Sequence, residues 1–95
     1  MELPVEHMRV YCERQPIRRL SVFGSYLGEH FSDDSDVDLL VEYVQDSCVT
    51  LLDMAQHEYD FTEMIGQRVD LRTPADLSRY FRDDVMQMAK SIYEA

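Results

Sequence analysis

The segment of residues 37–43 constrains the fold of this chain more than any other part of the sequence. It reads Val-Asp-Leu-Leu-Val-Glu-Tyr and is bounded by turn-forming residues, and this composition predicts a β-strand. Side chains alternate across a strand, so Val37, Leu39 and Val41 point to one apolar face. Because that face needs a layer to cover it, the segment predicts a sheet with helices packed against it.

Two further strands and four helices complete the predicted elements. Strands are expected at residues 20–23, which end abruptly at Gly24, and at residues 68–71. Apolar spacing, capping residues and prolines place the helices: between Pro4 and Pro16, between Thr50 and Gly66, from Thr73 through Phe81, and from Asp83 through Ile92. The order helix, strand, strand, helix, strand, helix, helix predicts the α+β fold class, with one small mixed β-sheet flanked by helices.

The long helix after Thr50 carries the clearest local signals. Thr50 and Asp53 match a capping pattern at its start, and Gly66 suits a left-handed cap at its end. Its apolar residues recur at helical spacing and are expected to form one face: Leu51, Leu52, Ala55, Tyr59, Thr62 and Ile65.

The C-terminal part is predicted to hold two helical stretches. Thr73-Pro74-Ala75-Asp76 combines a cap residue, a first-position proline and a capping acid, and it opens a stretch that carries Leu77, Tyr80 and Phe81. The last helix starts at Asp83 and Asp84, where the helix dipole favours negative charge. Its apolar face is expected to hold Val85, Met88, Ala89 and Ile92.

Length and composition bound the class of protein. We expect residues 1–95 to form a single domain, because a chain of 95 residues is too short for two cores. The chain has 9 Lys and Arg against 19 Asp and Glu, a formal charge of −10 that phosphate backbones repel, so no direct nucleic acid binding is expected. No apolar run is long enough for a membrane span and no signal peptide is recognisable, so we expect a cytoplasmic protein. The oligomeric state stays open.

Cysteine and histidine spacing gives no metal site. Cys12 and Cys48 lack zinc-site spacing, and both are expected to be small buried apolar groups. The histidines His7, His30 and His57 form no cluster with metal-ligand spacing either.

Gly24-Ser25 follows a predicted strand directly. Glycine lets the backbone turn sharply and approach a ligand closely, and Ser25 can cap the turn that follows. Free backbone N–H groups at such a turn, together with the serine hydroxyl, suit a phosphate. Taken alone, the dipeptide also fits a plain strand-to-helix turn.

Three acids are candidate metal ligands. Asp36 and Asp38 lie two residues apart at the head of the strongest strand and therefore share a face. Such carboxylates repel each other unless they are solvated, protonated or bound to a cation, and Mg²⁺ is the cation that oxygen ligands favour. Asp70, in the strand at residues 68–71, can join them if that strand lies beside the first acidic strand. Open solvation of each acid is the alternative.

The joint pattern is more specific than its parts. Gly24-Ser25, ten intervening residues and Asp36-Val37-Asp38 read G-S-x10-D-x-D. This resembles the signature of the nucleotidyltransferase superfamily that includes DNA polymerase beta, and more closely that of the minimal nucleotidyltransferase (MNT) group. The resemblance covers nearly the whole chain. It implies the polymerase beta-like nucleotidyltransferase fold.

The resemblance also implies roles for the site residues. Asp36, Asp38 and Asp70 would be the catalytic acids and bind Mg²⁺, with Asp70 assisting the incoming nucleophile. Gly24 and Ser25 would hold the triphosphate of ATP.

One departure from the group lies just after this pair. The group usually has arginine and glycine where this chain has Gly28 and Glu29, so a phosphate contact is missing. Arg18, Arg19 or Arg72 could replace it, but a solvated or salt-bridged surface position is the favoured interpretation of each.

The MNT group implies an antitoxin paired with a HEPN-family ribonuclease toxin, onto whose tyrosine hydroxyl AMP is transferred from ATP. The expected function is therefore that of a Mg²⁺-dependent protein adenylyltransferase. Two alternatives stay open. One is a binding-only antitoxin without useful catalysis, and the other is a small-molecule nucleotidyltransferase of the aminoglycoside-modifying kind. The second is disfavoured because no acceptor-binding domain follows residue 95.

Overall fold

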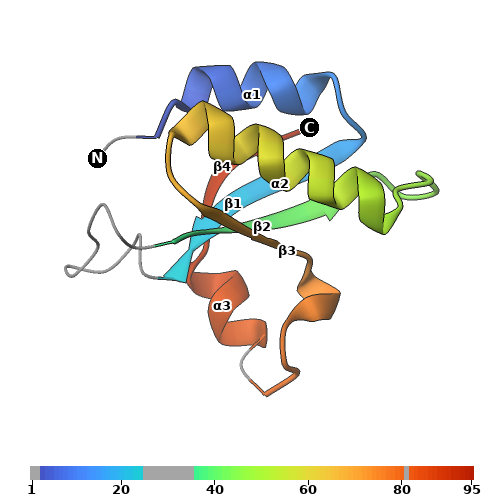
Figure 1. The fold of residues 1–95 in the computed structure, drawn as a ribbon. Helices are drawn as coiled ribbons and strands as arrows, with labels where there is room; N and C mark the ends of the chain where they lie inside the picture. Colours follow the sequence, from blue (N-terminus) through green and yellow to red (C-terminus); the bar gives the residue numbers. More distant parts are fainter. Residues whose placement is uncertain (1–2, 25–35, 81) are drawn as a thin grey trace.

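The chain folds around a four-stranded mixed sheet (Figure 1). The structure is a computed structural model, which describes residues 3–24, 36–80 and 82–95. The strand order is β3-β2-β1-β4; β1 is antiparallel to β2 and β4, and β2 is parallel to β3. The elements are α1 (Val5–Glu13), β1 (Ile17–Phe23), β2 (Val37–Tyr43), α2 (Leu51–Ile65), β3 (Val69–Arg72), the 3-10 turn η2 (Pro74–Asp76), α3 (Arg82–Met88) and β4 (Lys90–Glu94). The predicted class, a small mixed sheet flanked by helices, is confirmed.

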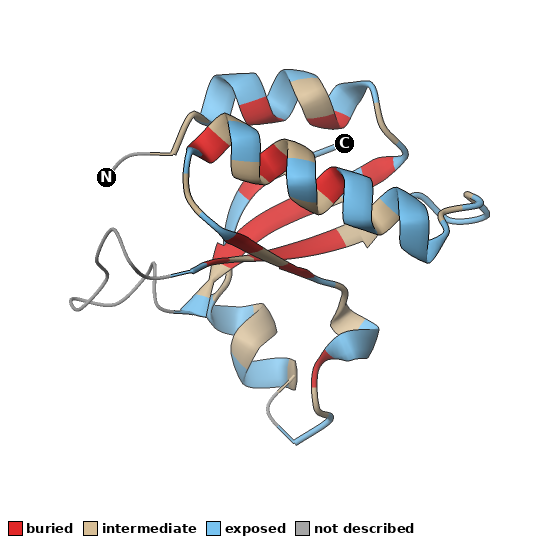
Figure 2. Cartoon of the chain, viewed as in Figure 1, coloured by how far each residue is buried: buried red, intermediate tan, exposed pale blue. Residues whose placement is uncertain are grey.

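The main core lies between the sheet and the α1–α2 layer. Both helices cover one face of the sheet, and η2 and α3 lie on the other side (Figure 1). Val37, Leu39 and Val41 are fully buried on the helix-covered face, as the alternation of β2 predicts, and they pack with Met8 and Phe61. Figure 2 shows the buried residues following the strands and the inward faces of the two helices.

The predicted caps of α2 are both present. The Thr50 backbone N–H donates to Oδ2 of Asp53 (2.9 Å), and the Asp53 backbone N–H donates to Oγ1 of Thr50 (3.2 Å). At the other end Gly66 adopts the left-handed conformation, with φ 76°, and its N–H donates to the Thr62 carbonyl. These caps fix the length of the helix that connects β2 to the parallel strand β3.

Side chains of α2 also satisfy the outer edge of β3. The Leu71 backbone N–H donates to Oε2 of Glu58 (2.9 Å), and the Val69 N–H donates to Oγ1 of Thr62 (3.3 Å). Glu58 and Thr62 are one helical turn apart and therefore lie on the same side of α2, and their partners Leu71 and Val69 are two residues apart and therefore point to the same side of β3. The helical repeat thus brings each side chain opposite an outward N–H of the strand. An edge strand with satisfied N–H groups is protected against pairing with another chain.

The prediction of a last helix reaching Ile92 is wrong. The helix α3 ends at Met88, and residues Lys90–Glu94 form a fourth strand, β4, that pairs with β1. Ile92 points from this strand into the main core. The local pattern could not reveal this, because the strand depends on a partner some seventy residues earlier in the chain.

The helix predicted to open at Thr73 is also shorter than expected. Only the 3-10 turn η2 forms, and the chain becomes extended at Leu77. Asp76 accepts hydrogen bonds from the Thr73 backbone N–H and hydroxyl, both at 3.0 Å, so the capping interaction closes a turn instead of starting a long helix. Phe81, which was expected in this helix, lies outside the described residues.

The predicted apolar face of α2 is mostly exposed. The side chains that α2 buries are His57, Phe61 and Ile65. Leu51 and Leu52 are 85% and 83% exposed, and Ala55 and Tyr59 are exposed as well. The helix carries two apolar stripes on different sides, and the one with the aromatic Phe61 packs on the sheet. The prediction that both cysteines are buried is half right, since Cys12 is buried and Cys48 is exposed.

No helix in the described ranges has both the length and the apolar character that crossing a membrane requires.

Candidate functional site

The turn at the end of β1 requires glycine. Gly24 has φ 73°, a left-handed conformation that other residues rarely adopt. The space that a Cβ at this position would fill is already occupied by the carboxylate of Asp38. The group that approaches the Gly24 backbone closely in this structure is a carboxylate of the protein itself, and the predicted approach to a phosphate stays a prediction. The predicted neighbour Ser25 lies outside the described residues.

Two predicted acids are direct neighbours across the sheet. In the parallel register of β2 and β3, Asp38 pairs with Asp70, and in the antiparallel register of β1 and β2, Asp38 pairs with Phe23. The condition stated for Asp70, that its strand lies beside the first acidic strand, is thus met. Paired residues on neighbouring strands point to the same face, so the Asp38 and Asp70 side chains project from one face of the sheet, with Asp38 beside the glycine turn. Like charges in this arrangement destabilise a sheet unless a cation compensates them.

Asp36 lies outside the regular part of β2. The strand begins at Val37, and Asp36 precedes it in an exposed position. Asp36 and Asp38 were predicted to share one face of the strand, but the structure holds Asp38 in the sheet and Asp36 in an exposed position just before it.

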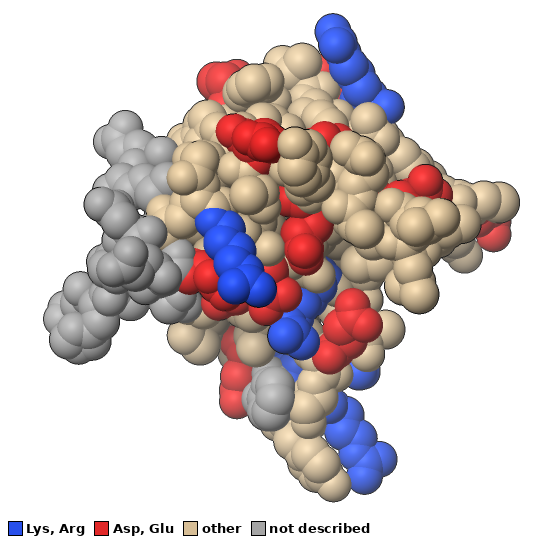
Figure 3. All heavy atoms as spheres, viewed as in Figure 1, with Lys and Arg blue, Asp and Glu red and all other residues tan. Residues whose placement is uncertain are grey.

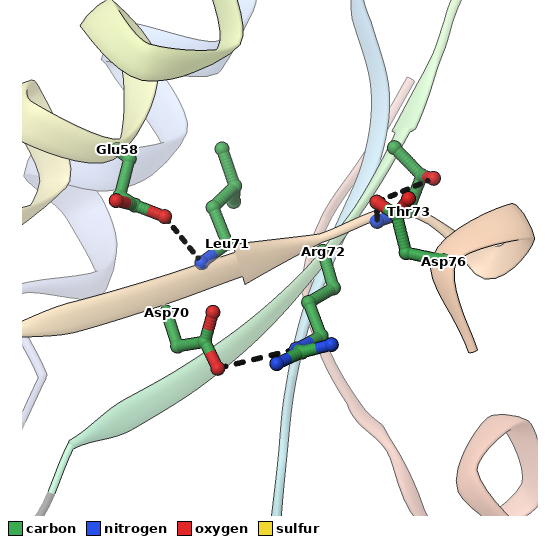
Figure 4. A network of polar contacts seen from close by, with 6 residues as sticks. All are labelled: Glu58, Asp70, Leu71, Arg72, Thr73 and Asp76. Carbon is green, nitrogen blue, oxygen red and sulfur yellow. Dashed lines mark hydrogen bonds and ion pairs between the residues drawn. The ribbon is translucent and has the colours of Figure 1, made fainter. Parts of the chain in front are cut away.

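An arginine on the same strand compensates part of the charge. Nε of Arg72 lies 3.1 Å from Oδ2 of Asp70, in an ion pair whose side chains are 48% and 38% exposed (Figure 4). At such exposure the pair contributes only about 0–1 kcal/mol, and solvent and salt screen it. The guanidinium nevertheless places a cation two residues along the face that carries the acids. The sequence favoured a solvated or salt-bridged surface position for Arg72 over a phosphate contact, and the ion pair agrees with that interpretation, although Asp70 was not predicted as its partner.

A second arginine from the same prediction is engaged elsewhere. Arg19 on β1 bridges Glu94 on β4, at 2.7 Å, and Glu42 on β2, at 3.5 Å. These pairs tie three strands together on the sheet and leave Arg19 with a structural role.

The acids suit Mg²⁺ in kind, but the described residues do not by themselves form a complete metal site. Among the described residues, no three Asp, Glu, His or Cys side chains gather as a metal-binding group. Mg²⁺ characteristically takes one or two protein carboxylates and completes its shell with water and substrate phosphates. Asp38 and Asp70 can supply these oxygens, so the donor set fits a cation that arrives with a nucleotide.

The sequence matches the nucleotidyltransferase domain family over residues 6–92. The chain belongs to this family. The match spans the glycine turn, both acidic strands and the helices that support them, so the family assignment rests on the same residues as the site.

The curated relatives are archaeal. A Methanocaldococcus jannaschii protein that bears the name of a protein adenylyltransferase is 30% identical over 76 residues, which cover 80% of each chain. The protein adenylyltransferase MntA of Thermococcus cleftensis is 37% identical over 65 residues, which cover 68% of this chain and 64% of MntA.

Solved structures share the fold. A structure described as a minimal nucleotidyltransferase superposes with a TM-score of 0.75 at 33% identity, covering 90% of this chain and 85% of the other. A chain in the complex of a triply AMPylated Shewanella oneidensis HEPN toxin with MNT antitoxin superposes with a TM-score of 0.65 at 16% identity, covering 96% and 71%. The resemblance to minimal nucleotidyltransferases and their fold is confirmed.

Proposed function

We propose that this protein is an antitoxin that transfers AMP from ATP to a tyrosine hydroxyl of a HEPN-family ribonuclease toxin, with Mg²⁺ as the cofactor. The observation that carries the proposal is the pairing of Asp38 with Asp70 beside the Gly24 turn. The names of the relatives support the reaction, since both are called protein adenylyltransferases. The toxin-antitoxin complex that shares the fold supports the choice of partner.

Asp36, Asp38 and Asp70 would hold the metal ion, which when bound offsets the negative charge that carboxylates and phosphates bring together. This need is strong here, because the chain carries a formal charge of −10 and ATP is itself an anion. Gly24 and Ser25 would place backbone N–H groups and a hydroxyl against the triphosphate. Arg72 is close enough to Asp70 to add a cationic contact to the same phosphates.

The reaction balances as a single group transfer. The tyrosine oxygen attacks the α-phosphorus, a new O–P bond forms, and the bond between the α-phosphorus and the bridging oxygen of the β-phosphate breaks. Pyrophosphate leaves with the electron pair of that bond. Asp70 would take the proton of the tyrosine hydroxyl as general base. The ribonuclease target and the ATP are both cytoplasmic, which makes the cytoplasm the proposed site of action.

A binding-only antitoxin is the second candidate. One observation favours it: Gly28 and Glu29 stand where the MNT group usually has arginine and glycine. Without that guanidinium the site has fewer cations to offset the charge that develops on the phosphates. In this case the protein would neutralise the toxin by forming a complex.

One experiment separates the two candidates. The purified protein is incubated with Mg²⁺, ATP labelled in the α-phosphate and the HEPN toxin encoded beside its gene, and the toxin is analysed by mass spectrometry. We expect label on a tyrosine with the native protein and with Glu13→Gln, a control that removes an exposed charge from α1, but none with Asp38→Asn. Neutralisation by Asp38→Asn without transfer would support the binding-only candidate. Absence of both transfer and neutralisation in the native protein would refute both.

A further inference from the structure

The outward face of α2 carries an apolar surface that the fold does not use. We call Leu51, Leu52, Ala55 and Tyr59 the α2 patch. At 100° per residue these four side chains lie within an arc of about 100°, with Leu52 and Tyr59 opposite the buried Phe61 and Leu51 about 80° to its side. Leu51 and Leu52 are 85% and 83% exposed, and Tyr59 is 59% exposed. Single exposed leucines are common, but a contiguous exposed apolar stripe of this kind marks an interaction surface.

The surroundings of the patch indicate what covers it. The helix α2 contains four acids, Asp53, Glu58, Asp60 and Glu63, and no lysine or arginine. Tyr59 donates a hydrogen bond to Glu63, so a carboxylate lies against the patch itself. Glu63 lies against the patch and the whole chain carries a formal charge of −10, so two copies packed patch to patch would repel each other, which disfavours a second copy of this chain. The charge therefore favours a partner that presents apolar side chains surrounded by lysine and arginine.

The patch begins far from the candidate active site. The helix starts at Leu51, after the carboxyl end of β2, and ends at Ile65, beside the end of the sheet that holds Asp38 and Asp70 (Figure 1). Fourteen helical steps separate Leu51 from Ile65, which is about 21 Å along the axis. A partner bound to the leucines would therefore gain affinity there without contacting the acids.

We propose that the α2 patch is the docking surface for the toxin, which presents an apolar surface rimmed by basic residues. This inference rests on the proposed function. Its consequence is that binding of the partner and transfer of the nucleotide depend on different residues of this chain. Changes in the patch should raise the KM for the toxin and leave kcat unchanged, whereas changes at Asp38 or Asp70 should lower kcat.

The test uses calorimetry to measure the affinity of the protein for the purified HEPN toxin. It compares a substitution in the α2 patch with one at an exposed site elsewhere. We expect Leu51→Gln/Leu52→Gln to weaken binding at least tenfold and to raise KM similarly with kcat unaltered. Glutamine keeps the helix propensity of leucine, so the melting temperature should stay the same. Tyr80→Ser is the matched control: Tyr80 is 81% exposed and follows η2 on the other side of the sheet, and its loss should change the affinity less than twofold. The native affinity should also fall as salt is added.

The outcomes separate this inference from the proposed function. Failure of the native protein to bind the toxin would overturn both. Tight native binding that Leu51→Gln/Leu52→Gln leaves unchanged would overturn the docking surface alone. A dimer of the isolated chain in sedimentation equilibrium, abolished by the same double substitution, would assign the patch to a second copy and would also overturn it.

Discussion

Two glycines with the same backbone conformation have different roles in this molecule. Gly24 and Gly66 have φ of 73° and 76°, yet a Cβ at position 24 would overlap the Asp38 carboxylate, and a Cβ at position 66 would meet nothing within 4 Å. Substituting each glycine therefore distinguishes the cost of a left-handed backbone, which both positions share, from the clash with the Asp38 carboxylate, which only position 24 has.

We predict that Gly24→Ala lowers the rate of AMP transfer at least tenfold, because the new methyl group displaces the Asp38 carboxylate from its place beside the turn. Gly66→Ala should keep the native rate. Both substitutions should cost about 1–2 kcal/mol of unfolding free energy from the left-handed backbone alone. Urea unfolding and transfer assays on the two variants check this, and equal rates for both would show that the approach of Gly24 to Asp38 is irrelevant to the reaction.

The two cysteines should react very differently. Cys12 is fully buried, and desolvation raises the pKa of its thiol to about 12, so little reactive thiolate forms at neutral pH. Cys48 is exposed in the loop before α2. We predict that iodoacetamide modifies Cys48 in the folded protein and reaches Cys12 only after unfolding, as peptide mass mapping would detect. Modification of both at one rate would contradict the burial of α1 against the sheet.

At the scale of elements, the attachment of α2 to the edge of β3 holds Asp70 in register. We predict that Glu58→Ala lowers the unfolding free energy by about 1–3 kcal/mol, because the Leu71 N–H loses a charged acceptor. Hydrogen exchange at the Leu71 amide should accelerate as well. Glu63→Ala, on the same helix but with no bond to β3 among the described contacts, should leave this exchange rate unchanged. Equal protection of the Leu71 amide in both variants would contradict the role given to Glu58.

A buried histidine joins α2 to its neighbours. Nε2 of His57 donates to Oε1 of Gln15 (3.2 Å), and Nδ1 lies 2.9 Å from the Tyr43 hydroxyl, from which it accepts. Burial lowers the pKa of His57 below the ordinary 6.5, because desolvation disfavours the imidazolium. As the pH falls through 6.5, the unfolded chain takes up a proton that the folded chain does not, so stability is lost toward acid pH.

We therefore predict that the unfolding free energy of the native protein decreases as the pH falls from about 7.5 to about 5. His57→Gln should flatten this dependence, and His7→Gln, which changes an exposed residue of α1, should not. Denaturant titrations at several pH values give the measurement. A slope that survives in His57→Gln would assign the pH dependence to other groups.

How much the sequence predicted differs between elements for physical reasons. The caps of α2 at Thr50, Asp53 and Gly66 are local interactions, and they were predicted correctly. The strand β4 and the buried face of α2 depend on distant partners, so a local pattern placed Ile92 in a helix and Leu52 in an apolar face that lies in solvent. Within the site, the adjacency of the acidic strands was stated as a condition and is met, and Arg72 is a salt-bridged surface residue as favoured, although its partner Asp70 was not predicted. The metal and nucleotide roles of the site residues remain predictions.

At the scale of the whole molecule, negative charge dominates. Asp and Glu side chains are spread over the face in Figure 3, and Lys and Arg side chains lie against some of them near its centre. A surface of this sign repels a free nucleotide, so binding of a nucleotide requires a cation to overcome the repulsion. The proposed requirement for Mg²⁺ therefore follows from the whole charge distribution as well as from Asp38 and Asp70.

The most direct test of this account is calorimetric titration of the protein with a non-hydrolysable ATP analogue, with and without Mg²⁺. We predict binding in the presence of Mg²⁺, at least tenfold weaker binding in its absence, and a similar loss in Asp38→Asn and Asp70→Asn with Mg²⁺ present. Binding that is equally strong without Mg²⁺, or that both substitutions leave intact, would contradict the claim that the paired carboxylates beside Gly24 form the nucleotide site.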